Sequence, residues 1–364
     1  MGQTSTRRLT LPLFVISTLS AAVSAYQAPK LPKVKDNSAQ NNSIEVITVT
    51  AQKRVENILQ VPISITSLNS DSMTKTGIRQ LNEIAEFVPN LTMTTTNDFS
   101  SSISIRGVGS ASRNIGFDAR VGLYLDGVYI GQSPAHNQDL LDLERIEVLR
   151  GPQGTLFGKN NVAGAINLIS KKPTDEFSGA VGFSIGNYDL QQYTAMFNTP
   201  LGDNVAAKFS FNQYQRSGFT ENISTGNWLD AQDNYAYRGQ IKATPFEVNF
   251  SFDRLRSERL SFDGEPITNT LGSAKNSEVV ARNKVSFDVD PNEDRDIKGE
   301  ILTIDWDIAN NYFIKSITGH REVYLNYIND FDFSNAAVSY LDYLDDYSQW
   351  SQEFQLISPE GDFQ

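Results

Sequence analysis

Cysteine is absent from this 364-residue chain, and histidine occurs only twice, at His136 and His320. Without thiols the chain has no disulfide framework, no thiolate metal site and no cysteine nucleophile. Neither histidine has a second ligand at the spacing of a metal site, so we expect both on the solvated surface and predict no metal site. Most classes of enzyme use cysteine or histidine side chains, so the composition disfavours them.

Positive charge is also scarce, because 31 Lys and Arg stand against 43 Asp and Glu. Nucleic acids are bound through stripes of Lys and Arg, so we exclude them as partners. One string, residues 182–186 (GFSIG), matches the nucleophile elbow of hydrolases. An elbow is a strand-to-helix turn, whereas Ser184 lies inside an alternating strand pattern. We therefore expect no catalytic residue and no enzyme activity.

Long apolar runs are missing after the N-terminus. Residues 1–25 combine Arg7 and Arg8, a mostly apolar stretch and a small-residue cleavage pattern, which predicts a secretory signal peptide. Residues 26–43 have the composition of a flexible linker. Since no later stretch reaches the length of a membrane-spanning helix, any membrane role must use an amphipathic or β mechanism. An exported protein without cysteine indicates the bacterial envelope.

Residues 52–172 predict a small α/β unit. Residues 77–88 have apolar side chains at helical spacing and predict a short helix that stops at Pro89. Strands are predicted over 103–107, 121–130, 146–149 and 165–169, the second of them folded into a hairpin at Asp126-Gly127. Two glycine clusters, 106–112 and 151–159, lack the residues of a dinucleotide or phosphate loop and indicate tight backbone packing.

The pattern changes after Lys172, because apolar and polar residues now alternate with a period of two. About eight such segments are long enough to cross a bilayer as tilted strands. They are 177–187, 189–199, 204–216, 233–243, 246–256, 298–309, 311–323 and 347–357. Tight connections at 200–203, 244–245 and 310–311 alternate with long polar ones at 217–232, 257–297 and 324–346. This asymmetry favours a transmembrane barrel over a soluble β-sandwich.

One long motif carries a resemblance. Residues 143–158 (LERIEVLRGPQGTLFG) and 164–170 (GAINLIS) resemble the plug-domain signature of TonB-dependent outer-membrane receptors. Residues 103–108 and 124–128 resemble two earlier plug strands, and 351–356 (SQEFQL) is similar to a strand of the family's iron-complex receptors. The resemblance covers residues 44–364.

The resemblance implies an α+β plug domain followed by an antiparallel transmembrane β-barrel. The family's barrel has 22 strands, whereas about eight are predicted here, too few to enclose a plug. We therefore expect the chain to be an incomplete fragment. The expected parts are a signal peptide (1–25), a linker (26–43), an energy-coupling box (44–51), a plug (52–172) and the N-terminal portion of the barrel (173–364).

The implied function is TonB-dependent active transport of a scarce ligand across the Gram-negative outer membrane. The expected partners are the TonB protein, outer-membrane lipid and a small metal chelate, without a cofactor. A ferric siderophore is the default ligand, while haem, vitamin B12, nickel complexes and oligosaccharides stay open. A passive pore or adhesive barrel with a structural N-terminal domain is the alternative, and a secreted β-rich hydrolase is a third.

The resemblance also implies site residues. Those of the TonB-coupling box are Glu45, Val46, Ile47, Thr48, Val49 and Thr50; from the residues alone, 44–51 is equally an edge strand or a tethered peptide that adds to another protein's sheet. Arg106 and Arg150 are expected to latch the plug to barrel carboxylates, with Glu353 as a partner. Ligand contacts are expected in outward plug loops, at Asp98, Phe99, Arg113, Phe117 and Tyr129. The acidic segment 329–347 is expected to be a solvated outer loop.

Overall fold

A computed structural model describes residues 48–50, 52–54, 56–96, 100–109, 119–136, 138–261, 282–308 and 312–359. The predicted signal peptide, the linker and the first half of the coupling box lie outside these residues. The chain divides into two compact units, 1–45 and 46–364, and all described residues belong to the second. None of the helices in the described part is long and apolar enough to span a membrane.

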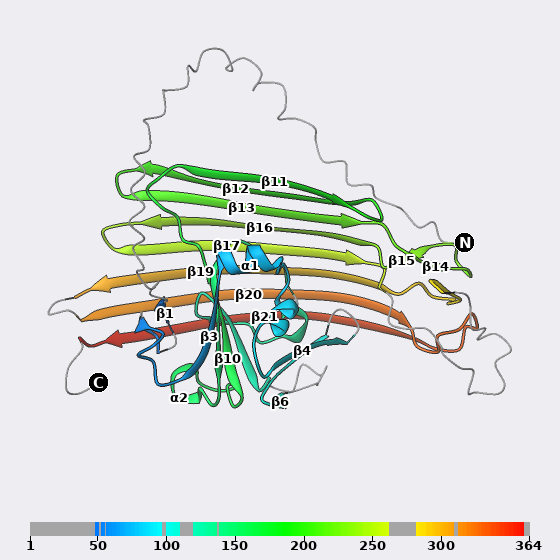
Figure 1. Cartoon of the computed structure of the whole chain (residues 1–364), viewed down its shortest axis with the longest axis horizontal. Helices are drawn as coiled ribbons and strands as arrows, with labels where there is room; N and C mark the ends of the chain where they lie inside the picture. Colours follow the sequence, from blue (N-terminus) through cyan, green and yellow to red (C-terminus); the bar gives the residue numbers. More distant parts are fainter. Residues whose placement is uncertain are drawn as a thin grey trace, which may run out of the picture. The chain divides into compact units, whose positions relative to one another are not determined.

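A large antiparallel sheet of eight strands follows the order β11-β12-β13-β16-β17-β19-β20-β21 (Figure 1). The strands are β11 (Ser178–Gly186), β12 (Leu190–Gly202), β13 (Val205–Arg216), β16 (Gln232–Ala243), β17 (Glu247–Arg259), β19 (Asn292–Asp307), β20 (Phe313–Asp330) and β21 (Tyr340–Ile357). All eight predicted segments are confirmed as strands, and neighbours in sequence pair with each other.

The last three strands are longer than predicted, with 16, 18 and 18 residues. The connection predicted at 324–346 shrinks accordingly, since β20 ends at Asp330 and β21 begins at Tyr340. The prediction of a long acidic loop there is wrong in its bounds. The physical reason is that apolar alternation stops before backbone pairing does: the outer part of β19 carries Glu293 and Arg295 on its inward face and Asp294 and Asp296 on its outward face.

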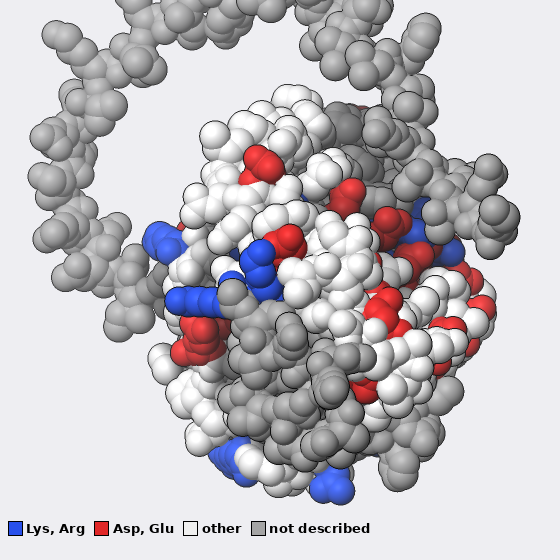
Figure 2. Space-filling view, turned by 90° about the vertical axis from the view of Figure 1, so that its right-hand side faces the viewer, with Lys and Arg blue, Asp and Glu red and all other residues white. Residues whose placement is uncertain are grey.

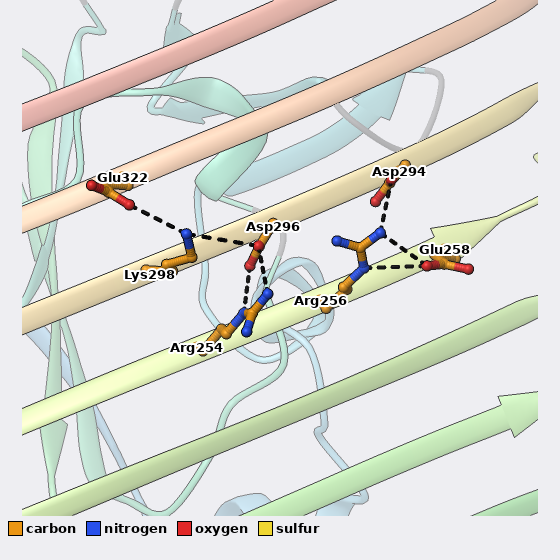
Figure 3. A network of polar contacts seen from close by, with 7 residues as sticks. All are labelled: Arg254, Arg256, Glu258, Asp294, Asp296, Lys298 and Glu322. Atoms are coloured by element: carbon orange, nitrogen blue, oxygen red, sulfur yellow. Dashed lines mark hydrogen bonds and ion pairs between the residues drawn. The ribbon is translucent and has the colours of Figure 1, made fainter. Parts of the chain in front are cut away.

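The two faces of the sheet differ in chemistry. On β17, Leu255 and Ser257 are buried on the inward face, which contacts the plug, whereas Phe250 and Phe252 are exposed on the outward face. Further along the same outward face lies a charged network that joins β17, β19 and β20 (Figure 3). Its members are Arg254, Arg256, Glu258, Asp294, Asp296, Lys298 and Glu322. The outward face therefore changes from apolar to charged along the strands.

The two ends of the sheet also differ. The tight connections β12–β13, β16–β17 and β19–β20 share one end, and the long ones share the other with the short β11–β12 hairpin. At the long-connection end β14 (Thr220–Asn222), β15 (Trp228–Leu229) and β18 (Lys284–Val285) form a small sheet over buried Leu229, Val285 and Phe287. Viewed from this end, acidic side chains gather along one side of the surface (Figure 2).

The plug contains a five-stranded sheet in the order β3-β9-β10-β7-β8. Its strands are β3 (Ser64–Asn69), β9 (Leu143–Arg150), β10 (Gly164–Ser170), β7 (Val121–Leu125) and β8 (Val128–Tyr129). A second sheet joins β4 (Leu91–Thr96), β5 (Ser100–Ile105) and β6 (Val108–Gly109), and short helices are α1 (Ser70–Thr76), η1 (Leu81–Glu86), η2 (Ser133–Ala135) and α2 (Gly154–Phe157). All five residues of β7 are buried, so the plug has its own apolar core.

The helix predicted over 77–88 is confirmed only over Leu81–Glu86, as the 3₁₀ helix η1. Gly77 adopts φ 74° and ends α1, and Gln80 is extended before η1 begins at Leu81. A helix cannot continue through a left-handed residue followed by an extended one. The strand predicted over 103–107 likewise ends at Ile105, because the next two residues form a turn with positive φ. The hairpin at Asp126-Gly127 is confirmed, with φ 48° and 89°.

Tight packing of the two predicted glycine clusters is confirmed only at Gly109, where a Cβ would lie 2.5 Å from Ser104 Cβ; a Cβ at Gly107, Gly154 or Gly158 would meet nothing within 4 Å. Gly164 has φ 157°, and a Cβ there would lie 2.2 Å from the Leu149 carbonyl oxygen. Gly151 and Gly158 also have positive φ. Ser184 lies in β11, within a fully exposed strand, as its alternating pattern predicted.

The predicted surface position is wrong for His136, whereas His320 is partly exposed on the outward face of β20. His136 is only 4% exposed, and its Nε2 lies 3.1 Å from the Ile130 carbonyl oxygen. Burial lowers its pKa to about 4, so the ring is neutral. The polar sequence around it hid this burial, because η2 turns the segment inward. His320 lies in the middle of β20, where its ring stacks on Trp350 at 4.3 Å.

Candidate functional site

The described part of the predicted coupling box, Thr48 to Thr50, lies on the plug as a strand and is called the coupling segment below. Thr48 and Val49 form β1, which pairs with β2 (Glu56–Asn57) in an antiparallel ladder. Between them the Lys53 backbone N–H donates to the Thr50 carbonyl oxygen at 3.0 Å, and Lys53 itself has φ 63°. The segment therefore folds back on itself before it enters the plug.

Val49 anchors this hairpin through apolar contact. Its side chain is fully buried, in a cluster with Val61, Tyr124, Leu149 and Ala165. The neighbouring Thr48 is exposed, as expected when successive residues of a strand point to opposite faces. Burying a valine contributes about 1.5–3 kcal/mol relative to leaving it exposed, so docking has a sizeable hydrophobic component.

Thr50 anchors the hairpin through polar contact with Glu147 of β9. The Thr50 backbone N–H donates to Glu147 Oε1 at 2.8 Å, and its hydroxyl lies 3.1–3.2 Å from both carboxylate oxygens. Glu147 is fully buried, and Arg145 Nε donates to the same carboxylate at 2.8 Å. A buried carboxylate needs such donors, because its desolvation is otherwise unfavourable.

Lys53 connects the hairpin to the large sheet. Its Nζ lies 3.1 Å from Glu353 Oε1 on β21 and 4.7 Å from the centroid of the Phe157 ring. Arg54 donates to the Ser358 hydroxyl at 3.4 Å, just after β21 ends. The coupling segment thus lies at the tight-connection end of the sheet.

The three predicted latch residues are not brought together. Glu353 does bind a plug residue, but that residue is Lys53, which the sequence reasoning missed although it follows the coupling box directly. Arg150 donates to the Pro89 carbonyl oxygen at 3.3 Å, within the plug. Among the described residues, no carboxylate lies within ion-pair distance of Arg106 or Arg150. Their latch role stays a prediction.

Other polar contacts hold the plug to the inward face of β13 and β16. Lys208 forms a buried ion pair with Asp142 at 2.7 Å, and the Ser210 hydroxyl donates to the same carboxylate. Arg238 donates to the Leu141 carbonyl oxygen at 3.0 Å. Each contact uses a polar inward residue of the alternating strand pattern.

The ligand residues can be located only in part. Asp98, Phe99, Arg113 and Phe117 lie outside the described residues. Tyr129 lies in β8, where its hydroxyl accepts from Asn160 at 3.0 Å and its carbonyl oxygen accepts from Gln349 of β21 at 2.9 Å. It lines a hollow of about 620 Å³ between the plug and β20–β21. Its role toward a ligand stays a prediction.

The chain is similar in sequence to a known family of proteins. Residues 57–165 match the family model of the TonB-dependent Receptor Plug Domain. The pesticin receptor of Yersinia pestis is 29% identical over 179 residues, which cover 48% of this chain and 26% of that protein. An iron-regulated outer membrane virulence protein of Vibrio cholerae is 32% identical over 169 residues, 45% of this chain and 24% of that protein. The chain therefore matches about a quarter of the length of these relatives.

Solved structures show the same fold. The ferric yersiniabactin uptake receptor FyuA from Yersinia pestis superposes with a TM-score of 0.70 at 21% identity, covering 82% of this chain and 46% of that one. The ferripyoverdine receptor of Pseudomonas aeruginosa gives 0.68 at 18% identity, covering 85% and 41%. The resemblance to TonB-dependent outer-membrane receptors is thereby confirmed, for a plug domain and part of a barrel. That family consists of transport receptors and not of enzymes.

Proposed function

We propose that this chain, a TonB-dependent receptor plug with its first barrel strands, serves the active import of a ferric siderophore across the outer membrane of a Gram-negative bacterium, without enzyme activity. The observation that carries the proposal is the docked coupling segment, with Val49 buried and Thr50 bound to Glu147. Such a segment has no purpose in a passive pore. The curated relatives support the ligand class, since they include a ferric-pyoverdine receptor of Pseudomonas putida at 27% identity.

The location of the coupling segment supports the same proposal. In outer-membrane barrels the tight turns face the periplasm and the long loops face outward. Lys53 and Arg54 contact Glu353 and Ser358, at the tight-connection end of the sheet. A periplasmic domain of TonB can reach that end, and an extended segment there suits recognition by β-strand addition once it leaves the plug.

The plug argues against the rival reading of a passive pore. Its apolar core includes inward residues of the sheet, among them Ile301, Ile317 and Val323. A plug packed in this way occupies the space along the inward face through which a solute would diffuse. Passage then requires a rearrangement of the plug, which is what an energised transporter provides.

Uptake of radioactive iron tests the proposal. Cells that express the full-length receptor are given ⁵⁵Fe bound to yersiniabactin, pyoverdine or a catecholate chelate, with haem and vitamin B12 as further ligands. We expect uptake of one ferric chelate that stops when residues 44–51 are deleted or when TonB is absent, while binding of the chelate to the cells persists. Uptake that continues in both backgrounds would establish a passive pore instead.

A further inference from the structure

The docking of the coupling segment depends on one buried side chain of the plug. Among the described residues Glu147 accepts from three donors, and two of them are the backbone N–H and the hydroxyl of Thr50, whose single proton lies within reach of both carboxylate oxygens. The third donor is Arg145 Nε of β9. If Thr50 leaves, the Glu147 carboxylate keeps a single donor in a fully buried position. Undocking of the segment and solvation of this carboxylate are therefore one event.

The same contact occupies a group that a partner strand would need. Strand addition uses main-chain hydrogen bonds along the edge of the recognised segment. The Thr50 N–H is already bound to Glu147, and β1 is already paired with β2. A periplasmic partner must compete with both contacts before it can pair with this part of the segment.

We propose that Glu147 is the positioning residue that sets the fraction of receptors whose coupling segment is docked. This inference rests on the proposed function, because the contact between Thr50 and Glu147 would then control access of TonB to the coupling segment. Val49 provides apolar attraction without direction, whereas the charged acceptor at Glu147 fixes the register of Thr50. Hydrogen bonds to a charged group are among the stronger ones in proteins, so this contact is able to control the equilibrium.

The chain offers a matched control on the same strand. Glu144 also contacts the Arg145 guanidinium, but its side chain is half exposed and has no contact with the coupling segment among the described residues. Exchange of either glutamate for glutamine removes one negative charge beside Arg145. Only the exchange at Glu147 alters an acceptor of Thr50.

The absence of cysteine makes a clean accessibility experiment possible. Val49→Cys places a single thiol in the coupling segment, and Ala135→Cys places one in the plug core, where Ala135 is fully buried. Labelling rates with a maleimide are measured on the full-length receptor, with any cysteine outside these 364 residues replaced by serine, in isolated outer membranes without TonB or ligand. Each reporter is combined with Glu147→Gln, Thr50→Val, Thr50→Ser or Glu144→Gln.

We expect Thr50→Val and Glu147→Gln to raise the labelling rate at position 49 by about tenfold, the factor expected when bonds to a charged acceptor are lost. Thr50→Ser keeps the hydroxyl and should stay within about twofold of the parent, as should Glu144→Gln. The double variant of Glu147→Gln and Thr50→Val should label no faster than the faster single variant, because both remove the same interaction. Labelling at position 135 should not change.

Two results would overturn the inference. One is an unchanged rate at position 49 in both Thr50→Val and Glu147→Gln. The other is a parallel rise at positions 49 and 135, which would mean that the plug unfolds as a whole. Because the readout needs neither ligand nor TonB, a receptor that failed the iron-uptake test could still pass this one, and the two failures are distinguishable.

Discussion

The plug contacts the large sheet in two regions of different chemistry. On β13 and β16 the contacts are mainly polar, with the ion pair between Lys208 and Asp142 and the bond from Arg238 to a backbone oxygen. On β19 and β20 they are mainly apolar, since Ile301 and Ile317 belong to the same buried cluster as the plug core, with one polar contact from Arg295 to the Pro134 carbonyl oxygen at 2.8 Å. Polar contacts exchange with water at a small net free energy, whereas buried apolar surface has no such substitute.

Close packing reinforces the apolar region. The tip of the β7–β8 hairpin lies against β20, where a Cβ on Gly319 would meet both γ carbons of Val128 at 2.6 Å. A Cβ on Gly127 would meet Ile317 at 2.9 Å. We call the closely packed contact at β19 and β20 the fitted side, and the polar contact at β13 and β16 the exchangeable side, because water can replace its hydrogen bonds. Movement of the plug should therefore begin at β13 and β16.

The largest effect is expected when the buried ion pair is broken from one side. Lys208→Met leaves the Asp142 carboxylate buried without its cation, which destabilises plug docking by about 3–5 kcal/mol. Hydrogen exchange of β9 and β10 amides measures the change. Adding Asp142→Asn, which suits the positive φ of 52° at that residue, should recover most of the loss. A double variant as unstable as the single one would contradict the idea that this side is exchangeable.

Overpacking of the fitted side should have the next largest effect. Gly319→Ala forces Val128 out of its position and should destabilise docking by about 1–3 kcal/mol in the same exchange measurement. Val128→Ala in the same chain makes room for the added methyl group and should reverse part of the change. If Gly319→Ala were neutral on its own, the fitted side would be as adaptable as the polar one.

Acid should loosen the plug through His136. Its pKa is about 4 in the folded protein and near 6.5 when unfolded, so below pH 6.5 the unfolded state binds the extra proton. The contribution of the neutral ring is therefore complete above pH 6.5 and declines by about 2 kcal/mol by pH 5. Exchange rates of the plug measured from pH 7.5 to 5 should rise, and less so in His136→Gln. Equal pH profiles for the two proteins would remove His136 as the cause.

The smallest effect is expected at the ion pair between Lys53, which follows the coupling segment, and Glu353 of β21. Glu353→Gln breaks the pair with Lys53, but the carboxylate is 39% exposed, so docking should weaken by less than about 1 kcal/mol and less again at high salt. Glu322→Gln, which breaks an outward pair with Lys298, is the control. If Glu353→Gln alone weakened plug docking by more than about 2 kcal/mol, this ion pair would be a third region that holds the plug to the sheet.

Local patterns predicted much of this fold. Period-two alternation located all eight large strands, and the Asp126-Gly127 pair located a hairpin whose φ values require such residues. Tertiary contacts decided the rest. Nothing local distinguishes buried His136 from a surface histidine, and the pairing of Lys53 with Glu353 joins residues 300 positions apart. The helix predicted over 77–88 forms only from Leu81, because Gly77 ends the preceding helix α1 and Gln80 is extended.

The charged network on β17, β19 and β20 has a consequence for the surface that an antibody would meet. An 18-residue strand is about 60 Å long, while the hydrocarbon core of a bilayer is about 30 Å thick. In the proposed orientation the ends that carry Arg256, Asp294 and Glu258 stand clear of the lipid. Antibodies recognise folded surfaces of fixed shape, and this paired sheet offers one, so the outer ends of these strands form a conformational epitope rather than a linear one.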